Sequence, residues 1–109
     1  MRFNYCPDCG EELKLKQLGD EGDVPFCEKC GKPWFEMFSS AVIVLVVNED
    51  GEAALLRQSY ISDKYYNLVS GYMKPGENAE ETARREVAEE IGIEMTDLRL
   101  IGTYWFAKK

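Results

Sequence analysis

The chain has 109 residues, of which 45% are hydrophobic and 30% are charged. Such a length holds one ordinary domain or two very small ones, and this hydrophobic content is ordinary for a folded protein. A formal net charge of −7 argues against a protein that binds a nucleic-acid backbone through a basic surface. The sequence contains no histidine, which excludes Ser-His-Asp and Cys-His catalysis and any zinc hydrolase with histidine ligands.

Four cysteines form two pairs near the start of the chain, Cys6-Pro-Asp-Cys9 and Cys27-Glu-Lys-Cys30, and a glycine follows each pair. This spacing is typical of zinc knuckles, and four thiolates form a closed structural zinc site rather than a catalytic one. We therefore predict that the four cysteines bind one Zn²⁺. Two disulfides in a secreted protein, or free reactive thiols, are the alternatives. The two-residue separations and the lack of a signal peptide favour metal and a cytoplasmic protein.

The predicted zinc ribbon occupies residues 1–38 as a small β domain. We expect strands near 12–18 and 34–38, with a glycine-rich turn at 19–23. A segment of about forty residues lacks a sufficient core of its own, so zinc would contribute much of its stability.

The second part of the chain spans residues 39–109. It begins with the apolar run 41–47, which is rich in β-branched residues and predicts a central buried strand. This run is too short to span a membrane. The remaining expected elements are a hairpin turn at 48–51, a loop at 59–64, and strands at 53–58, 66–69 and 98–106.

A helix is predicted between Asn78 and Gly92. Asn78 suits the N-cap, and Glu81, three residues later, completes a capping box. Gly92 suits the left-handed position just past the helix end. At about 100° per residue, one apolar stripe runs along this helix and should pack on a sheet. The stripe consists of Ala79, Ala83, Val87 and Ile91.

Three glutamates, Glu86, Glu89 and Glu90, lie beside that stripe within five positions. Carboxylates this close repel one another, and hard cations such as Mg²⁺ or Mn²⁺ take oxygen ligands. Arg85 can hold the carboxylates apart by hydrogen bonding. We therefore predict a divalent-cation site. The alternative is a solvated acidic face with Arg–Glu pairs.

The spacing of residues 71–93 resembles the Nudix box. That pattern runs Gly, five residues, Glu, seven residues, Arg-Glu, an aliphatic residue, any residue, Glu-Glu, any residue, Gly, and an aliphatic residue. The nine matching positions are Gly71, Glu77, Arg85, Glu86, Val87, Glu89, Glu90, Gly92 and Ile93. The resemblance implies a Nudix α/β/α sandwich with a mixed sheet, so that the whole chain is α+β. It also implies hydrolysis of a nucleoside diphosphate linked to another group.

The resemblance assigns roles at the acidic cluster. Glu86 and Glu90 correspond to direct ligands of Mg²⁺ or Mn²⁺, and Glu89 corresponds to a ligand or to the base that activates water. The backbone carbonyl of Ser70 is often a further ligand in the family. Arg85 belongs to the catalytic set together with these glutamates.

Three other box residues have structural roles by the same resemblance. Gly71 and Gly92 are structural glycines. Glu77 is either a loop anchor or a more distant, water-mediated ligand.

A four-cysteine ribbon before a Nudix box resembles the NADH pyrophosphatase branch of the family. That branch cleaves NADH and NAD⁺ into mononucleotides, and some members remove NAD caps from RNA. A Ser-Gln-Pro-Trp-Pro-Phe-Pro segment usually follows the box in this branch, whereas residues 102–109 here contain aromatic residues but no proline. ADP-ribose, another dinucleotide and a nucleoside diphosphate sugar therefore stay open as substrates.

Aromatic side chains are the candidates for stacking on a base or nicotinamide ring. Tyr72 follows the box glycine directly, and Phe35 and Trp105 are the other two candidates. Packing inside the protein is the alternative role for each.

A Nudix domain usually continues well beyond the point where this chain stops, so we expect an incomplete sheet and a poorly active fragment. The strand expected at 98–106 would then leave an apolar edge that invites a partner strand, and the family resemblance also suggests a homodimer. A non-catalytic module that senses a nucleotide or binds RNA is the alternative to an enzyme.

Overall fold

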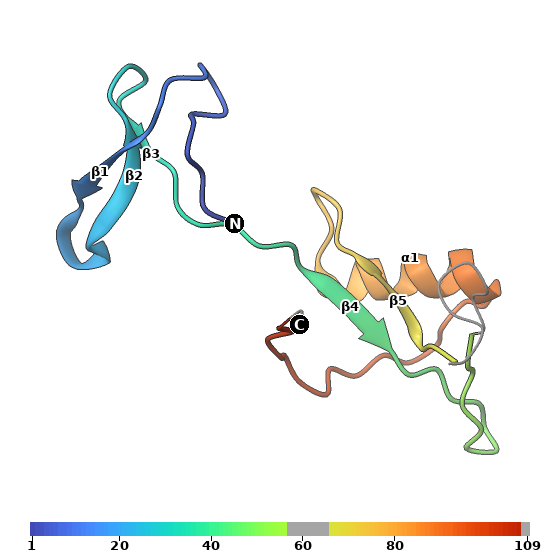
Figure 1. Cartoon of the computed structure of the whole chain (residues 1–109). Coiled ribbons are helices and arrows are strands. Elements are labelled where there is room, and N and C mark those ends of the chain that lie inside the picture. The colour runs from blue at the N-terminus through green and yellow to red at the C-terminus, as the bar shows by residue number, and fades with distance from the viewer. Residues whose placement is uncertain (57–65, 108–109) are drawn as a thin grey trace. The chain divides into compact units, whose positions relative to one another are not determined.

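A computed structural model describes residues 1–56 and 66–107 of the chain. It divides into two compact units, Met1–Ser39 and Ser40–Lys109 (Figure 1). No helix in the described part of the chain is long and apolar enough to cross a membrane. The predicted loop 59–64 and the end of the strand predicted at 53–58 lie outside the described residues.

The first unit contains a three-stranded antiparallel sheet with the order β1-β2-β3. The strands are β1 (Lys14–Gln17), β2 (Asp23–Cys27) and β3 (Lys32–Pro33), and the short 3-10 helix η1 (Gly19–Glu21) joins the first two. The strand predicted at 12–18 is thus confirmed in shorter form. The buried residues of this unit are few, namely Cys6, Val24, Pro25 and Cys27.

The strand predicted at 34–38 is wrong. Pairing with β2 ends just after β3, where the Trp34 N–H donates to the Pro25 carbonyl at 2.8 Å. The chain then turns to its own start, and the Met37 N–H donates to the Met1 carbonyl at 2.9 Å. The central strand β2 was missed because a proline stands in it and has no N–H to donate.

In its described residues, the second unit contains a two-stranded sheet covered on one face by a helix. Strands β4 (Ala41–Val44) and β5 (Val69–Tyr72) pair antiparallel, with Val42 opposite Gly71 and Ile43 opposite Ser70. Helix α1 (Ala79–Ile91) contacts both strands. The hydrophobic core of this unit consists of Val44, Val69, Ala83 and Val87. The α+β class predicted from the sequence is confirmed.

Helix α1 begins and ends where the sequence predicts. The Asn78 side chain accepts from the Glu81 N–H at 2.8 Å, and the Glu81 side chain accepts from the Asn78 N–H at 3.3 Å. Gly92 closes the helix in the left-handed region, at a φ of 69°. One member of the predicted stripe is misplaced, because Ala79 is exposed and Thr82 is buried instead.

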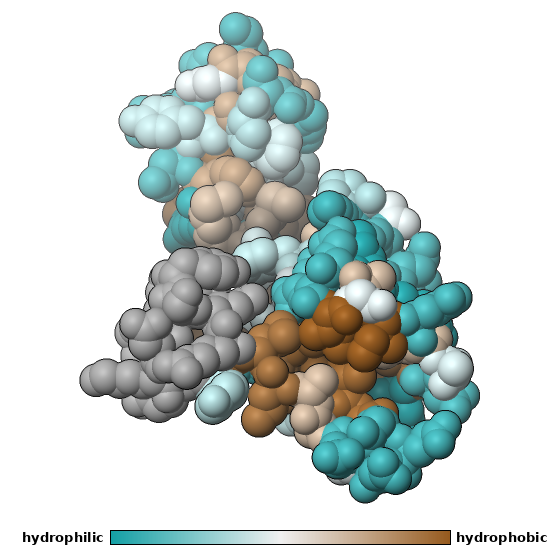
Figure 2. Space-filling model, turned by 90° about the vertical axis from the view of Figure 1, so that its right-hand side faces the viewer, coloured by the Kyte–Doolittle hydropathy of each residue, from teal (hydrophilic) through white to brown (hydrophobic). Residues whose placement is uncertain are grey.

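Strand β4 is not buried on both faces as predicted. Its side chains alternate, so Val44 lies in the core while Ile43 is 73% exposed. Two more apolar side chains beyond the strand, Leu45 and Val47, are about half exposed. Hydrophobic residues accordingly gather on one exposed face (Figure 2).

Two further strand predictions are corrected. The strand expected at 66–69 starts only at Val69 and continues through Ser70 and Gly71 to Tyr72, so the first box residue lies inside the sheet. Among the described residues, 98–106 form no strand, and 100–106 are exposed. Strand 53–58 is represented in the described part by isolated bridges from Ala53 to Val47 and from Leu56 to Asn67.

Candidate functional site

The four cysteines converge in the first unit. Their sulfur atoms all lie within 4.8 Å of one another, and the structure contains them as free thiols. The Cys30 N–H donates to the Cys27 sulfur at 3.2 Å. The glycine after each pair closes a tight turn, with the Gly10 and Gly31 N–H groups each 2.8 Å from the carbonyl of the first cysteine of the pair. This is the donor set of a tetrahedral zinc site.

The electrostatics of the cysteine cluster also fit a cation. Burial opposes ionisation of Cys6, but backbone N–H groups of Cys9 and Asp8 and the neighbouring thiols lower its pKa to about 6. The Cys9 sulfur and burial raise the pKa of Cys30 to about 12. Four thiolates at these separations would need a counter-charge, which a bound Zn²⁺ would supply.

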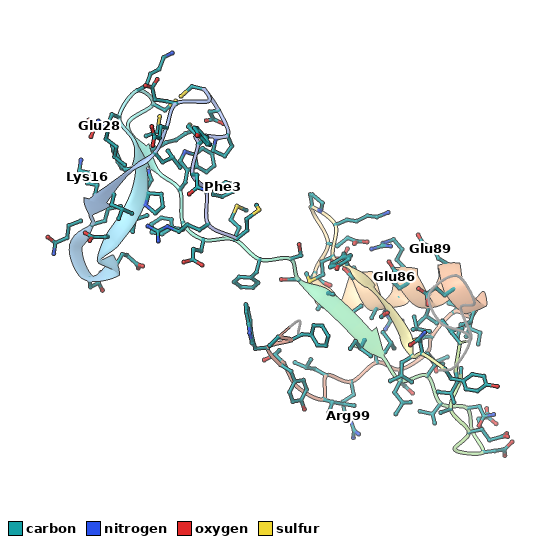
Figure 3. All side chains as sticks on the ribbon, in the orientation of Figure 1. Phe3, Lys16, Glu28, Glu86, Glu89 and Arg99 are labelled. Carbon is teal, nitrogen blue, oxygen red and sulfur yellow. The ribbon has the colours of Figure 1, made fainter. Side chains whose placement is uncertain are left out.

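In the second unit, Arg85 holds the box together. Its Nε and Nη2 atoms donate to Glu77 at 2.6 and 2.9 Å, as a bidentate pair. Its Nη1 atom donates to Glu86 at 2.7 Å and to Glu89 at 3.3 Å. Nη2 also donates to the Tyr72 carbonyl at 3.1 Å, which ties helix α1 to strand β5. The Glu86 and Glu89 side chains both come from α1 (Figure 3).

Glu77 accepts hydrogen bonds from four donor groups. Besides the two from Arg85, they are the Lys74 N–H at 3.0 Å and the Thr82 hydroxyl at 3.1 Å. These groups, with Arg85 the largest contribution, lower the pKa of Glu77 to about 2. Of the two roles left open by the sequence, the geometry favours the loop anchor.

The Arg85–Glu77 ion pair should make the free energy of unfolding depend on pH under acidic conditions. The pKa of Glu77 lies at about 2 in the folded chain, below its ordinary value of 4.5. The pair therefore stabilises the fold fully above the ordinary value, and the contribution disappears as the pH falls toward about 2. Urea unfolding followed by helix circular dichroism between about pH 6 and pH 2 measures this loss. The Glu77→Gln variant should lack this contribution, and an identical pH profile for variant and wild type would contradict the prediction.

Gly71 makes room for the Glu86 carboxylate. A β-carbon at this position would lie only 2.6 Å from Glu86 Oε2 and closer still to the other carboxyl atoms. The contact explains why a strand residue facing the helix is glycine. Backbone conformation does not explain the glycine, since Gly71 is not among the glycines with positive φ.

Replacing Gly71 with alanine should therefore move the Glu86 carboxylate. We expect a loss of about 10- to 100-fold in Mn²⁺ affinity or hydrolysis, the range seen when a ligand loses its orientation. The matched control is Gly102→Ala, where the nearest atom is the exposed Tyr104 hydroxyl at 3.0 Å, and it should behave like wild type. Equal activity of both variants would contradict this assignment.

Glu90 carries a carboxylate oxygen that lacks a partner. Its Oε2 atom is buried and has no hydrogen bond among the described residues. Burial, followed by the charge of Glu86, raises the pKa of Glu90. A hard cation would satisfy a buried carboxylate oxygen that has no partner and lies beside a second carboxylate, so these residues fit Mg²⁺ or Mn²⁺.

The remaining predicted ligands lie near by in sequence and structure. Ser70 lies on β5 next to Gly71. A hydrogen bond with its backbone lowers the pKa of Glu90 and so offsets part of the rise caused by burial. Glu89 is more open, with 54% of its side chain exposed. Among the described residues, only the four cysteines bring three or more possible metal-ligand atoms close together. The glutamate carboxylates do not form such a cluster, and Glu86 and Glu89 instead pair with Arg85. The glutamate roles stay predictions.

The three aromatic candidates are all surface residues. Tyr72 and Trp105 are 69% and 77% exposed in the second unit, and Phe35 is 49% exposed in the first. Exposure leaves their rings accessible to a ligand, and their part in substrate binding stays a prediction.

One polar residue near the site escaped the sequence analysis. Thr82 is fully buried, and its hydroxyl contacts both Glu77 and the Asn78 carbonyl. The available signal was a threonine in a helix four residues after its N-cap, where the hydroxyl can bond back to the preceding turn.

Comparison with known proteins agrees with this geometry. The model of the NUDIX domain family matches residues 37–109. The NAD-capped RNA hydrolase NudC of Pseudomonas aeruginosa is 33% identical over 99 residues, which cover 91% of this chain and 34% of that protein. Nudix hydrolase 19, chloroplastic, of Arabidopsis thaliana is 35% identical over 95 residues, covering 86% of this chain and 22% of that protein.

Two further comparisons concern a human protein and a solved structure. The human NAD-capped RNA hydrolase NUDT12 is 29% identical over 106 residues, covering 92% of this chain and 23% of that protein. The chain thus spans about a third or less of the length of these relatives. The crystal structure of a NUDIX hydrolase from Nitrosomonas europaea has the same fold, with a TM-score of 0.63 and 22% identity over 80% of this chain and 50% of that one. The chain belongs to the Nudix family.

Proposed function

We propose that this chain carries the metal-binding part of a Mg²⁺- or Mn²⁺-dependent Nudix hydrolase that cleaves the pyrophosphate of an NAD-linked compound. The observation that best supports this proposal is the buried Oε2 atom of Glu90, which has no hydrogen-bond partner among the described residues and lies beside Glu86. The names of three relatives, which are NAD-capped RNA hydrolases, support an NAD-linked substrate. NADH, NAD⁺, ADP-ribose and the NAD end of a capped RNA share the same nucleoside diphosphate group.

In this proposal each residue has a separate task. Glu86, Glu90 and the Ser70 carbonyl hold the cation, and Arg85 fixes Glu86 from the other side. The bound ion would neutralise phosphate charge and lower the pKa of a water molecule. Glu89, whose carboxylate is exposed, acts as a further ligand or accepts the proton of the attacking water. Attack of water at one phosphorus forms a new P–O bond and breaks the bridging P–O bond. The products are two phosphate monoesters, one of which is AMP for NADH, NAD⁺ and ADP-ribose and the 5′-phosphate end of the RNA for a capped RNA.

Zinc has a structural task in this proposal. The closed set of four cysteine thiols leaves no open ligand position for a substrate. Such thiols stay reduced in the cytoplasm, where we place the protein. The exposed apolar side chains Ile43, Leu45 and Val47 support a homodimer as the assembly, with a small-molecule dinucleotide as the substrate partner.

Incubation of the full chain with NADH, ADP-ribose and NAD-capped RNA tests the proposal. The expected result is release of AMP from NADH and ADP-ribose, and of nicotinamide mononucleotide from the capped RNA. This release should depend on Mg²⁺ or Mn²⁺, and EDTA should abolish it. Nucleotide binding without turnover of any of these substrates would instead indicate a non-catalytic, nucleotide-sensing module.

The order of preference among the substrates is a second readout. The net charge of −7 disfavours strong contacts with an RNA backbone. Capped RNA should therefore be used no better than free NAD⁺ at low salt, and its use should depend little on salt concentration.

A further inference from the structure

Thr82 is a buried polar side chain in the helix that carries the acidic cluster. It is fully buried, although it belongs to none of the nine specified box positions. Its Oγ1 atom lies 3.1 Å from Glu77 Oε1 and 3.1 Å from the Asn78 carbonyl oxygen. A buried hydroxyl is costly unless it is hydrogen-bonded, so these contacts matter for the fold.

The hydroxyl has one proton for two acceptors. The Asn78 carbonyl already accepts from the Thr82 backbone N–H at 3.0 Å, as an ordinary helix bond. The Glu77 oxygen is charged, and hydrogen bonds to charged acceptors are roughly twice as strong as neutral ones. The Glu77 carboxylate is therefore the acceptor that gains most from the hydroxyl.

Glu77 is linked through Arg85 to Glu86, the candidate metal ligand. Glu77 receives the two-pronged contact from Arg85 at 2.6 and 2.9 Å, and Arg85 donates onward to Glu86 at 2.7 Å. Arg85 and Glu77 are each about one-fifth exposed, and Glu86 is 13% exposed, so the connection is shielded from water. In such a network the orientation of one member depends on its neighbours.

We propose that Thr82 is a positioning residue for the cation site, acting on Glu86 through Glu77 and Arg85. This inference rests on the proposed function, since it assumes that Glu86 binds the metal. Threonine at this place fixes the Glu77 carboxylate from the helix side, while Lys74 fixes it from the loop side.

The test compares Thr82→Val with Thr82→Ser in the full chain. Valine keeps the shape and loses the hydroxyl, whereas serine keeps the hydroxyl and loses the methyl group. Mn²⁺ binding, followed by the spin-resonance signal of free Mn²⁺, should weaken about fivefold in Thr82→Val and stay within about twofold of wild type in Thr82→Ser. Circular dichroism verifies that each variant has folded.

The Glu77→Gln background provides the decisive control. There the valine substitution should have no further effect on Mn²⁺ affinity, because the charged acceptor is gone. A Thr82→Val variant that binds Mn²⁺ like wild type, or an equal loss in both backgrounds, overturns the inference. If the wild-type chain itself binds no Mn²⁺, the proposed function fails first and the inference fails with it.

Discussion

A Glu90→Gln variant is expected to lose about a thousandfold in kcat, because a metal ligand contributes several kcal/mol of transition-state stabilisation and each 1.4 kcal/mol is tenfold. Glutamine keeps the shape of glutamate but removes its charge. It also places an amide where a buried oxygen now has no partner. Hydrolysis of NADH at saturating Mg²⁺, together with Mn²⁺ binding, measures the effect.

The stability of this variant should move in the opposite direction. Burial and the charge of Glu86 raise the pKa of Glu90, so its ionised form is unfavourable in the folded chain without metal. Removing that charge should leave the metal-free melting temperature unchanged or higher. Loss of activity without loss of stability separates a functional residue from a structural one.

Glu80→Gln is the matched control for this experiment. Glu80 lies on the same helix, its side chain is 61% exposed, and it makes one weak ion pair with Arg84 at 3.8 Å. Removing its charge should leave activity within about twofold of wild type, as exposed pairs contribute little. A Glu90→Gln variant with kcat within tenfold of wild type would defeat the metal-ligand assignment.

Loss of zinc should unfold the first unit. Structural zinc binding contributes an apparent 10–16 kcal/mol, about as much as or more than the whole stability of an ordinary domain. The first unit buries only Cys6, Val24, Pro25 and Cys27, so little else holds it together. A Cys27→Ser variant should contain no zinc by elemental analysis, against one zinc per wild-type chain, and should lose the dispersed amide signals of residues 1–39.

The second unit should survive this change. Its core, built around Val69 and Val87, contains no residue of the first unit. Lys29→Ser, at an exposed position between Cys27 and Cys30, is the control and should keep its zinc. An ordered first unit in a zinc-free protein would contradict the prediction.

Local sequence signals predicted the helix correctly, because every contact that sets its ends lies within a few residues. The Asn78–Glu81 box and the left-handed Gly92 need no knowledge of the rest of the fold. The spacing of the cysteines likewise predicted that their sulfur atoms would converge, because each pair forms its own turn.

The strands were harder to predict, because a strand needs a partner that the local sequence does not name. Residues 34–38 look like a strand but lie beside the start of the chain. Strand β2 was overlooked because Pro25 stands within it. The apolar residues of 98–106 resemble a strand in composition, yet none of them lies in a strand of the described residues.

At the candidate site, the spacing named the residues but not their contacts. The pattern includes Gly71 and Glu86, but only the structure shows that the missing β-carbon makes room for the carboxylate. The sequence left two roles open for Glu77, and its four donor groups favour one of them. Thr82 could not be selected, because its importance depends on where the Glu77 side chain points.

The two tryptophans of the chain give each unit an optical reporter of its own. Trp34 lies in the first unit against Phe3, with ring centroids 5.7 Å apart, and its indole nitrogen is buried. Trp105 lies in the second unit and is 77% exposed. Chelation should thus shift the emission of Trp34 to longer wavelength and leave that of Trp105 unchanged, so that fluorescence distinguishes the fates of the two units without any label.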